Sequence, residues 1–226
     1  MLCEWVAVQN ESWQLRLKRW FENSGCDVLI LKAYEMTPAD YVLTRAAESA
    51  SLYGEALEEQ LLEHVDHFRQ RAVEMIYGGM VNMRRRRAEN WFLCEEMDET
   101  PDEELGEILL ERFATQDILE SRNEEELLAL KPRLAKGVQL LEESVQQGQS
   151  WKRRRIYLER RAGLSRRLAF DRAVADFIGC FDGKRPLGVL VNELAEQNKA
   201  PRSQAAKNGL QLIRKLSSLG LITLDG

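Results

Sequence analysis

The 226-residue sequence has few of the residues from which disulfide frameworks and metal sites are built. Its only two histidines, His64 and His67, are three residues apart in a Glu-rich stretch, with no third ligand in a suitable position. The cysteines lie far apart and form no C-x-x-C pair; they are Cys3, Cys26, Cys94 and Cys180. We therefore expect free thiols in a reducing cytoplasm and no bound metal.

Long apolar runs are also missing, because no stretch approaches the roughly 20 residues that a membrane-spanning helix needs. The opening residues Met1–Trp5 lack the basic segment and apolar core of a secretory signal. Hydrophobic residues make up 44% of the chain and charged residues 31%, as in ordinary globular proteins. The composition predicts a cytoplasmic protein without a membrane partner.

Acidic and basic residues are divided unequally along the chain. Residues 151–226 contain 16 Lys and Arg against 7 Asp and Glu, a net charge of +9, whereas residues 1–150 contain 16 against 30, a net charge of −14. These halves make up the overall charge of −5. So large a difference favours two modules with different roles.

The first thirty residues follow a strand–helix–strand pattern. Leu2–Val8 is a short apolar run, and Ser12 is placed to cap a helix that begins at Trp13. Cys26–Leu31 is apolar apart from Asp27, without alternation, which is typical of a strand covered on both faces. This order predicts a crossover unit of an α/β sheet.

The next seventy residues continue the α/β pattern. Pro38 marks a helix start, and a longer helix is expected from Tyr53 to Arg71. Val73–Arg84 is expected to be a strand in which Gly78-Gly79 indicates a bulge or a close backbone approach. Asn90–Glu95 is expected to be a return strand or an extension.

The C-terminal half is expected to be mainly helical, with one hairpin. Helices are predicted near 103–116 and 124–130, and Gly137–Gln146 and Trp151–Glu159 flank a turn. Three helices and a strand follow, at Asp171–Cys180, Leu187–Gln197, Arg202–Leu219 and Leu221–Leu224. This succession is typical of a winged-helix module, which contains a helix-turn-helix.

Three stretches resemble the last third of a class I S-adenosylmethionine-dependent methyltransferase, of a bacterial group related to the protein-glutamine and adenine N-methyltransferases. They are Trp13–Lys32, Thr37–Tyr41, and Ile76–Arg85 followed by Asn90-Trp91-Phe92. The resemblance implies that the strands here are the fifth, the sixth and the long antiparallel seventh of a Rossmann-like sheet. The tail after residue 100 also resembles the extra C-terminal region of this group.

The resemblance does not extend to the residues that perform chemistry in the family. Gly78-Gly79 is the only close glycine pair, so the glycine-rich cofactor loop is missing, and no two prolines are adjacent, so Asn-Pro-Pro-Tyr is missing too. S-adenosylmethionine is thus the cofactor of the family but is not expected to bind this chain alone. The sheet is expected to have an open edge at Leu2–Val8, which needs an N-terminal methyltransferase half or a second copy as its partner.

The expected organisation has three parts. Residues 1–100 form a partial methyltransferase domain, 101–168 form linker helices and a β-hairpin, and 169–226 form a mainly α winged-helix-like module. Several prominent residues are assigned to structure rather than chemistry. They are Asp27 and Glu35, and the tryptophans Trp5, Trp13, Trp20 and Trp91, which are assigned to the core.

Eight basic residues are candidates for contact with nucleic acid or another substrate. They are Arg84, Arg85, Lys152, Arg153, Arg154, Arg155, Arg202 and Lys207. Each has a second interpretation: a solvated turn for Arg84–Arg87, pairing with the acidic N-terminal module for Lys152–Arg155, and a protein contact for the helix that begins at Arg202.

Two functions follow from these features. The first is methyl transfer to a nitrogen of protein or nucleic acid, in which this chain supplies scaffold and substrate recognition and is inactive alone. The second is a non-enzymatic winged-helix module that binds nucleic acid or protein. Loss of DNA binding when Arg202 and Lys207 are changed to Glu would favour the second.

Overall fold

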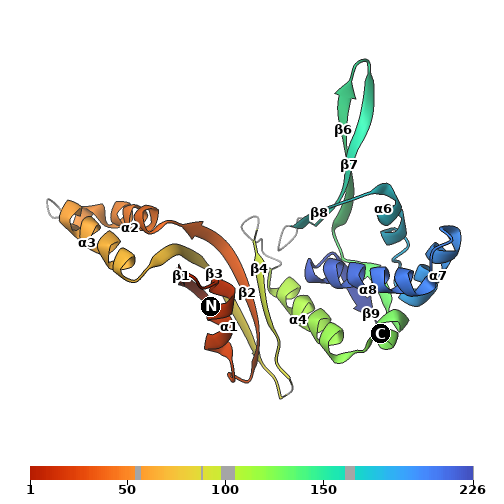
Figure 1. Ribbon diagram of the computed structural model, residues 1–226, viewed down its shortest axis with the longest axis horizontal. Helices are drawn as coiled ribbons and strands as arrows, with labels where there is room; N and C mark the ends of the chain where they lie inside the picture. Colours follow the sequence, from red (N-terminus) through yellow and green to blue (C-terminus); the bar gives the residue numbers. More distant parts are fainter. Residues whose placement is uncertain (54–56, 88, 98–104, 161–165, 226) are drawn as a thin grey trace. The chain divides into compact units, whose positions relative to one another are not determined.

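The computed structural model describes residues 1–53, 57–87, 89–97, 105–160 and 166–225 (Figure 1). The protein is mixed α/β and divides into two compact units, Met1–Met97 and Asp98–Gly226. The boundary predicted at residue 100 falls within 98–104, outside the described residues.

Unit 1 is built on a four-stranded mixed sheet. Its strands are β1 (Leu2–Val8), β2 (Cys26–Met36), β3 (Val73–Arg85) and β4 (Phe92–Glu96), in the order β1-β3-β2-β4. β3 runs antiparallel to both of its neighbours, whereas β4 runs parallel to β2. The three predicted strands are confirmed, but β4 does not return along β3, because β1 and β2 already occupy both edges of β3.

Three helices accompany this sheet, namely α1 (Trp13–Phe21), α2 (Pro38–Tyr53) and α3 (Leu57–Gln70). Ser12 caps α1 as predicted, since its hydroxyl accepts a hydrogen bond from the backbone N–H of Leu15. Trp13 and Leu17 of α1 pack on Trp5 and Val28 of the sheet. The five residues Asp27–Leu31 are all buried, which confirms a strand covered on both faces.

Gly78 and Gly79 allow β3 to lie tightly against β2, where a bulge follows Lys32. A Cβ on Gly79 would lie 2.0 Å from the backbone oxygen of Leu31, and one on Gly78 would lie 2.1 Å from the ring of Tyr34. Of the two interpretations of this pair, the close backbone approach is confirmed, whereas the bulge lies in β2 opposite the glycines.

Unit 2 combines five helices with two small antiparallel sheets among its described residues. The helices are α4 (Leu105–Ser121), α5 (Glu124–Ala129), α6 (Arg172–Ile178), α7 (Leu187–Gln197) and α8 (Arg202–Ser218). The strands are β5 (Lys131–Leu134) paired with β9 (Ile222–Asp225), and β6 (Val138–Gln147), β7 (Ser150–Arg160) and β8 (Arg166–Phe170) in sequence order. The predicted hairpin and the last three helices are confirmed, while β5 and β8 were not predicted.

One hydrophobic core joins the early and late parts of unit 2. Leu127 of α5 and Leu158 of β7 pack in the same cluster as Leu187, Ile213 and Leu221. Four of these side chains are fully buried because they come from elements that cover one another on all sides. The segment interpreted as linker helices and a hairpin is thus part of the same folded unit as the last three helices.

Candidate nucleic-acid interface

Helices α7 and α8 form a closely packed pair joined by only four residues, 198–201. The turn is tight because Lys199 adopts a positive φ of 50° and Pro201 precedes the first residue of α8. The helices approach closely where α8 has Gly209, since a Cβ there would lie 2.5 Å from Val191 Cγ2. This packing directs the opposite face of α8 outward.

The outward face of α8 is polar and basic. Its exposed residues are Ser203, Gln204, Lys207, Asn208, Gln211, Arg214 and Lys215. Gln204 Nε2 donates a hydrogen bond to Asn208 Oδ1 over 2.8 Å, which holds two carboxamides side by side. Because α8 contains no Asp or Glu, this face can attract anions without competition from its own helix.

The two candidates on α8 differ in their surroundings. Arg202 Nη2 lies 2.8 Å from Glu196 Oε1, so its charge is partly balanced at the turn. Lys207 is exposed, and no ion-pair partner for it is found in the part of the chain that the structure describes. Lys207 is therefore the stronger candidate for contact with an anion.

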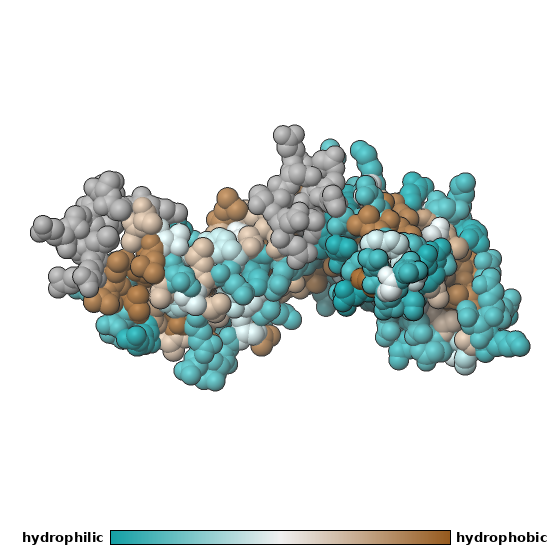
Figure 2. All heavy atoms as spheres, turned by 90° about the horizontal axis from the view of Figure 1, so that it is seen from above, coloured by the Kyte–Doolittle hydropathy of each residue, from teal (hydrophilic) through white to brown (hydrophobic). Residues whose placement is uncertain are grey.

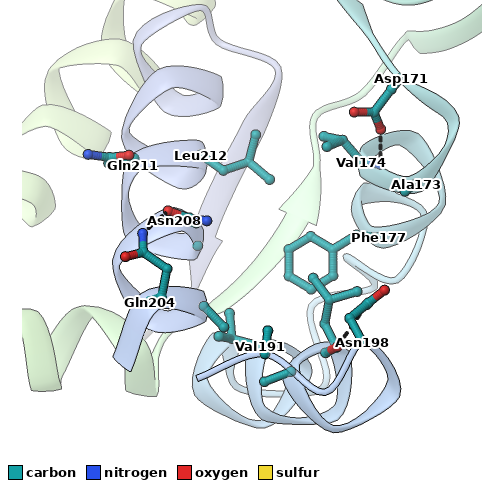
Figure 3. A pocket seen from close by; sticks show the side chains of 15 residues that line it. Asp171, Ala173, Val174, Phe177, Val191, Asn198, Gln204, Asn208, Gln211 and Leu212 are labelled. Carbon is teal, nitrogen blue, oxygen red and sulfur yellow. Dashed lines mark hydrogen bonds between the residues drawn. The ribbon is translucent and has the colours of Figure 1, made fainter. Parts of the chain in front are cut away.

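A groove of about 600 Å³ lies between α6, α7 and α8 (Figure 3). Its interior is apolar, with Phe177 from α6, Val191 from α7 and Leu212 from α8 directed into it. Carboxamides lie along its margin, among them those of Gln204 and Asn208. The sequence did not reveal this groove, because it depends on the angles at which three helices meet.

The hairpin of β6 and β7 extends away from the helices of unit 2 (Figure 1). Lys152–Arg155 occupies its second arm, and all four side chains are exposed. Arg153 pairs with Glu142 at 2.8 Å, and Arg154, which lies at a bulge, is 3.6 Å from Glu143. These arginines therefore pair with acidic residues of the hairpin itself.

Contacts at its base hold the hairpin on unit 2. Arg172 of α6 binds Glu142 over 2.7 Å, and the hydroxyl of Tyr157 donates to Glu143 over 2.8 Å. The guanidinium of Arg167 lies 3.8 Å from the centre of the Tyr157 ring. Both glutamates are thus engaged at the base, and the end of the hairpin keeps its positive charge.

Arg84 and Arg85 belong to unit 1 and have a different environment. Arg84 Nη2 lies 2.7 Å from Oδ2 of Asp27, a carboxylate with no exposed surface, and Arg86 lies 3.1 Å from the same oxygen. The other oxygen of Asp27 accepts hydrogen bonds from the Asn90 amide and the Trp91 backbone N–H, both at 3.3 Å. Arg84 therefore neutralises a buried charge and is not placed to hold a substrate, while Arg85 is exposed.

A second polar cluster surrounds Glu4 at the edge of the same sheet. Its carboxylate accepts hydrogen bonds from Tyr34 at 2.6 Å and Tyr41 at 2.7 Å, and pairs with Arg45. Partial burial acts to raise the pKa of Glu4, but these hydrogen bonds and the charge of Arg45 outweigh it and lower the pKa. Burial and the bond to Glu4 raise the pKa of Tyr34 to about 12, so it remains a hydrogen-bond donor at neutral pH.

The described residues include few groups arranged for metal ligation, and one of the thiols is shielded by burial. No group of three potential ligands is brought together there, and His67 stacks edge-on against Phe68. Burial raises the pKa of the Cys94 thiol to about 12, which keeps it protonated and unreactive. No helix of the described chain has the length and apolar character to cross a bilayer.

Two tryptophans are largely exposed in the structure. Trp20 was expected in the core but is 56% exposed, with the guanidinium of Arg16 5.5 Å from its ring centre. Trp151, which was not singled out, is 72% exposed at the end of the hairpin. Its position beside four consecutive basic residues was the available signal. No family model matches the chain, and no curated protein matches it.

Proposed function

We propose that unit 2 binds nucleic acid through the outward face of α8, with the basic hairpin adding contacts to phosphates. Two helices joined by four residues correspond to a helix-turn-helix, in which the second helix enters the major groove. The observation that carries the proposal is the acid-free outward face of α8, which presents carboxamides together with Lys and Arg.

The residue types suit the two tasks of such an interface. Gln and Asn side chains can pair with both the N6 and N7 positions of adenine, so Gln204, Asn208 and Gln211 are suited to reading bases. Lys207 and Arg214 lie on the same exposed face and are suited to phosphate contact. The four basic residues of the hairpin add charge that attracts the nucleic-acid backbone.

Charge reversal on α8 tests the proposal. The full chain would be titrated with a fluorescein-labelled DNA duplex at several salt concentrations, comparing the unchanged protein with Lys207→Glu/Arg214→Glu. Each lost phosphate contact lowers the salt slope by about 0.9, so the double variant should bind at least about tenfold more weakly at low salt, with a shallower slope.

A matched control reverses two exposed lysines elsewhere in unit 2, as Lys131→Glu/Lys136→Glu. This variant changes the net charge equally but leaves α8 intact, so its duplex binding should fall much less. Equal loss of duplex affinity in the two variants would mean that binding depends on net charge and not on α8, which contradicts the proposal. Unchanged binding by the α8 variant would also refute it.

A second function, as part of a methyltransferase, is favoured by the topology of unit 1. β3 is antiparallel to both β1 and β2, which is the relation expected of a seventh strand beside the fifth and sixth. In this proposal unit 1 is scaffold for N-methylation of protein or nucleic acid, and unit 2 recognises the substrate. β1 lies at the edge of the sheet, and Met1 exchanges both backbone hydrogen bonds with Val81.

This edge is where a catalytic partner would join. Because backbone groups alternate in direction along a strand, those of Leu2, Glu4 and Val6 point away from β3. They are suited to pairing with a strand of an N-terminal methyltransferase half or of a second copy.

The described residues do not fit a site for S-adenosylmethionine. The one adjacent glycine pair, Gly78-Gly79, has its free space filled by the Tyr34 ring and the Leu31 carbonyl, so it cannot cradle a cofactor. Calorimetric titration of the chain with S-adenosylmethionine should therefore give no binding heat. One-to-one binding in that titration would contradict the assignment of this chain to scaffold and recognition.

A further inference from the structure

We infer that Trp151, at the end of the β6–β7 hairpin, stacks on an unpaired base of a single-stranded segment of nucleic acid. This inference deepens the proposed function of unit 2, because it names the form of nucleic acid that the hairpin recognises. α8 would hold duplex, and the hairpin would hold the unpaired strand beside it.

The first support is the exposure of the indole. Trp5, Trp13 and Trp91 are between 3% and 8% exposed, whereas Trp151 is 72% exposed. Trp151 lies opposite Gln146 in the hairpin register, and no ring or cation contact is found for it within the described chain. A free indole at the end of a projecting hairpin has a large apolar face available for contact, and the residues around it decide what it contacts.

The second support is the charge around the indole. Residues 144–155, which form the end of the hairpin, contain four Lys and Arg and no Asp or Glu. The nearest glutamates, Glu142 and Glu143, lie below this segment and are already bound by arginines and Tyr157. A positive segment that carries one exposed aromatic ring matches a polyanion whose units each present a flat face.

The other side chains at this end argue against a lipid surface. Gln146, Gln147, Gln149 and Ser150 surround the turn, and all are exposed. Viewed along the hairpin, its end is mostly hydrophilic (Figure 2). Insertion into a membrane needs an apolar surface larger than one indole, whereas glutamine and serine can donate hydrogen bonds to phosphates and to the edges of unpaired bases.

An unpaired base is favoured over a base in duplex because of what each exposes. In duplex DNA both faces of a base are covered by its neighbours, and only the edges are accessible in the grooves. In a single strand the face is open to an aromatic side chain, and such stacking tolerates any base. An exposed tryptophan at the end of a basic hairpin is therefore suited to an unpaired base of a single strand.

Three DNA probes test the inference with the full chain: a blunt duplex, the same duplex with an oligothymidine overhang, and oligothymidine alone. The unchanged protein should bind the overhang probe more tightly than the blunt duplex. Trp151→Ala should lose this advantage and bind oligothymidine about tenfold more weakly, while its affinity for the blunt duplex stays the same. Trp151→Phe keeps an aromatic face. It should therefore retain most of the preference for the overhang probe and most of the affinity for oligothymidine.

Trp20→Ala is the matched control, since Trp20 is also exposed but lies on α1 of unit 1. It should bind all three probes like the unchanged protein. Indole fluorescence gives a second measurement: oligothymidine should quench the emission of the unchanged protein, and Trp151→Phe should remove that quenching.

The outcomes separate this inference from the proposed function. If Lys207→Glu/Arg214→Glu weakens duplex binding but Trp151→Ala changes no probe, the α8 interface stands and the stacking role is refuted. If no duplex binds but oligothymidine binds in a Trp151-dependent way, the stacking role stands without the α8 interface. If phosphatidylserine vesicles quench the fluorescence of Trp151 and oligothymidine does not, Trp151 contacts a membrane instead of a base, and the inference is overturned.

Discussion

Two runs of four basic residues, Arg84–Arg87 and Lys152–Arg155, resemble each other in sequence but have opposite places in the structure. In unit 1, Arg84 and Arg86 converge on the buried carboxylate of Asp27. In unit 2, Lys152–Arg155 lies on a projecting hairpin where all four side chains are exposed. The comparison teaches that a basic run is available for binding only where its side chains do not form ion pairs with a buried acid.

The largest effect is expected from removing that acid. Asp27→Asn leaves two arginines facing a buried site without a counter-charge, which typically costs about 3–5 kcal/mol of the free energy of unfolding. Urea unfolding followed by tryptophan fluorescence reports mainly on unit 1, because four of the five tryptophans are in it. Arg85→Gln/Arg87→Gln, which changes only exposed arginines of the same run, should stay within about 0.5 kcal/mol.

The next effect concerns how β3 lies against β2. Gly79→Ala places a Cβ 2.0 Å from a backbone oxygen that cannot rotate away, so we expect a loss of about 1–3 kcal/mol or more in the stability of unit 1.

Gly106→Ala provides the contrast for this substitution, since its Cβ would meet nothing within 4 Å in α4. Because Gly106 is the second residue of α4, better helix propensity should stabilise unit 2 by less than the about 1 kcal/mol of an interior position, which circular dichroism in urea would measure. A destabilised Gly106→Ala or an unaffected Gly79→Ala would contradict this account of the packing.

A smaller effect is expected on the affinity for oligothymidine, to which Lys152–Arg155 should contribute and Arg84–Arg87 should not. Lys152→Glu/Arg155→Glu should weaken binding to oligothymidine about tenfold at low salt, because both side chains are exposed and neither has an ion-pair partner within the described chain. Arg85→Glu/Arg87→Glu reverses as many charges in unit 1 and should leave the affinity nearly unchanged. If both pairs weaken binding equally, the distinction between the runs fails.

The smallest effect is expected on how the stability of unit 1 depends on pH. Because its pKa is lowered by folding, Glu4 contributes stability that is present above its unfolded pKa, about 4.3, and is lost as the pH falls through the lower folded pKa. Glu4→Gln should reduce the difference in urea midpoint between pH 7 and pH 3. Glu63→Gln, at an exposed position of α3, should leave that difference as it is.

The positions of most helices and strands were predictable from the sequence because they depend on local signals. The Ser12 cap, the Pro38 helix start and the Gly78-Gly79 approach were each expected and are each present. The hairpin and the three C-terminal helices followed from turn residues and helical spacing. β5 was missed because it is short and pairs with β9, which is distant in the sequence. β8 was missed because it is only five residues long, although it pairs with the preceding strand β7.

The candidate site was predictable only as a set of residue types. Lys152–Arg155 and Lys207 were identified from charge, and both lie exposed in unit 2. The exposure of Trp151 and the groove beside α8 were not identified, because each depends on which surfaces the folded chain leaves uncovered.

The sequence by itself thus determined most of the secondary structure, the charge difference between the halves and the places where basic residues gather. Only the tertiary structure decided which basic run is exposed to solvent along its whole length. Asp27 and Arg84 are 57 residues apart, and the pairing of β2 with β3 places them opposite each other. The buried carboxylate then attracts two arginines strongly because little water remains to solvate it, whereas the hairpin has no such acid near its end and its charges remain directed to solvent.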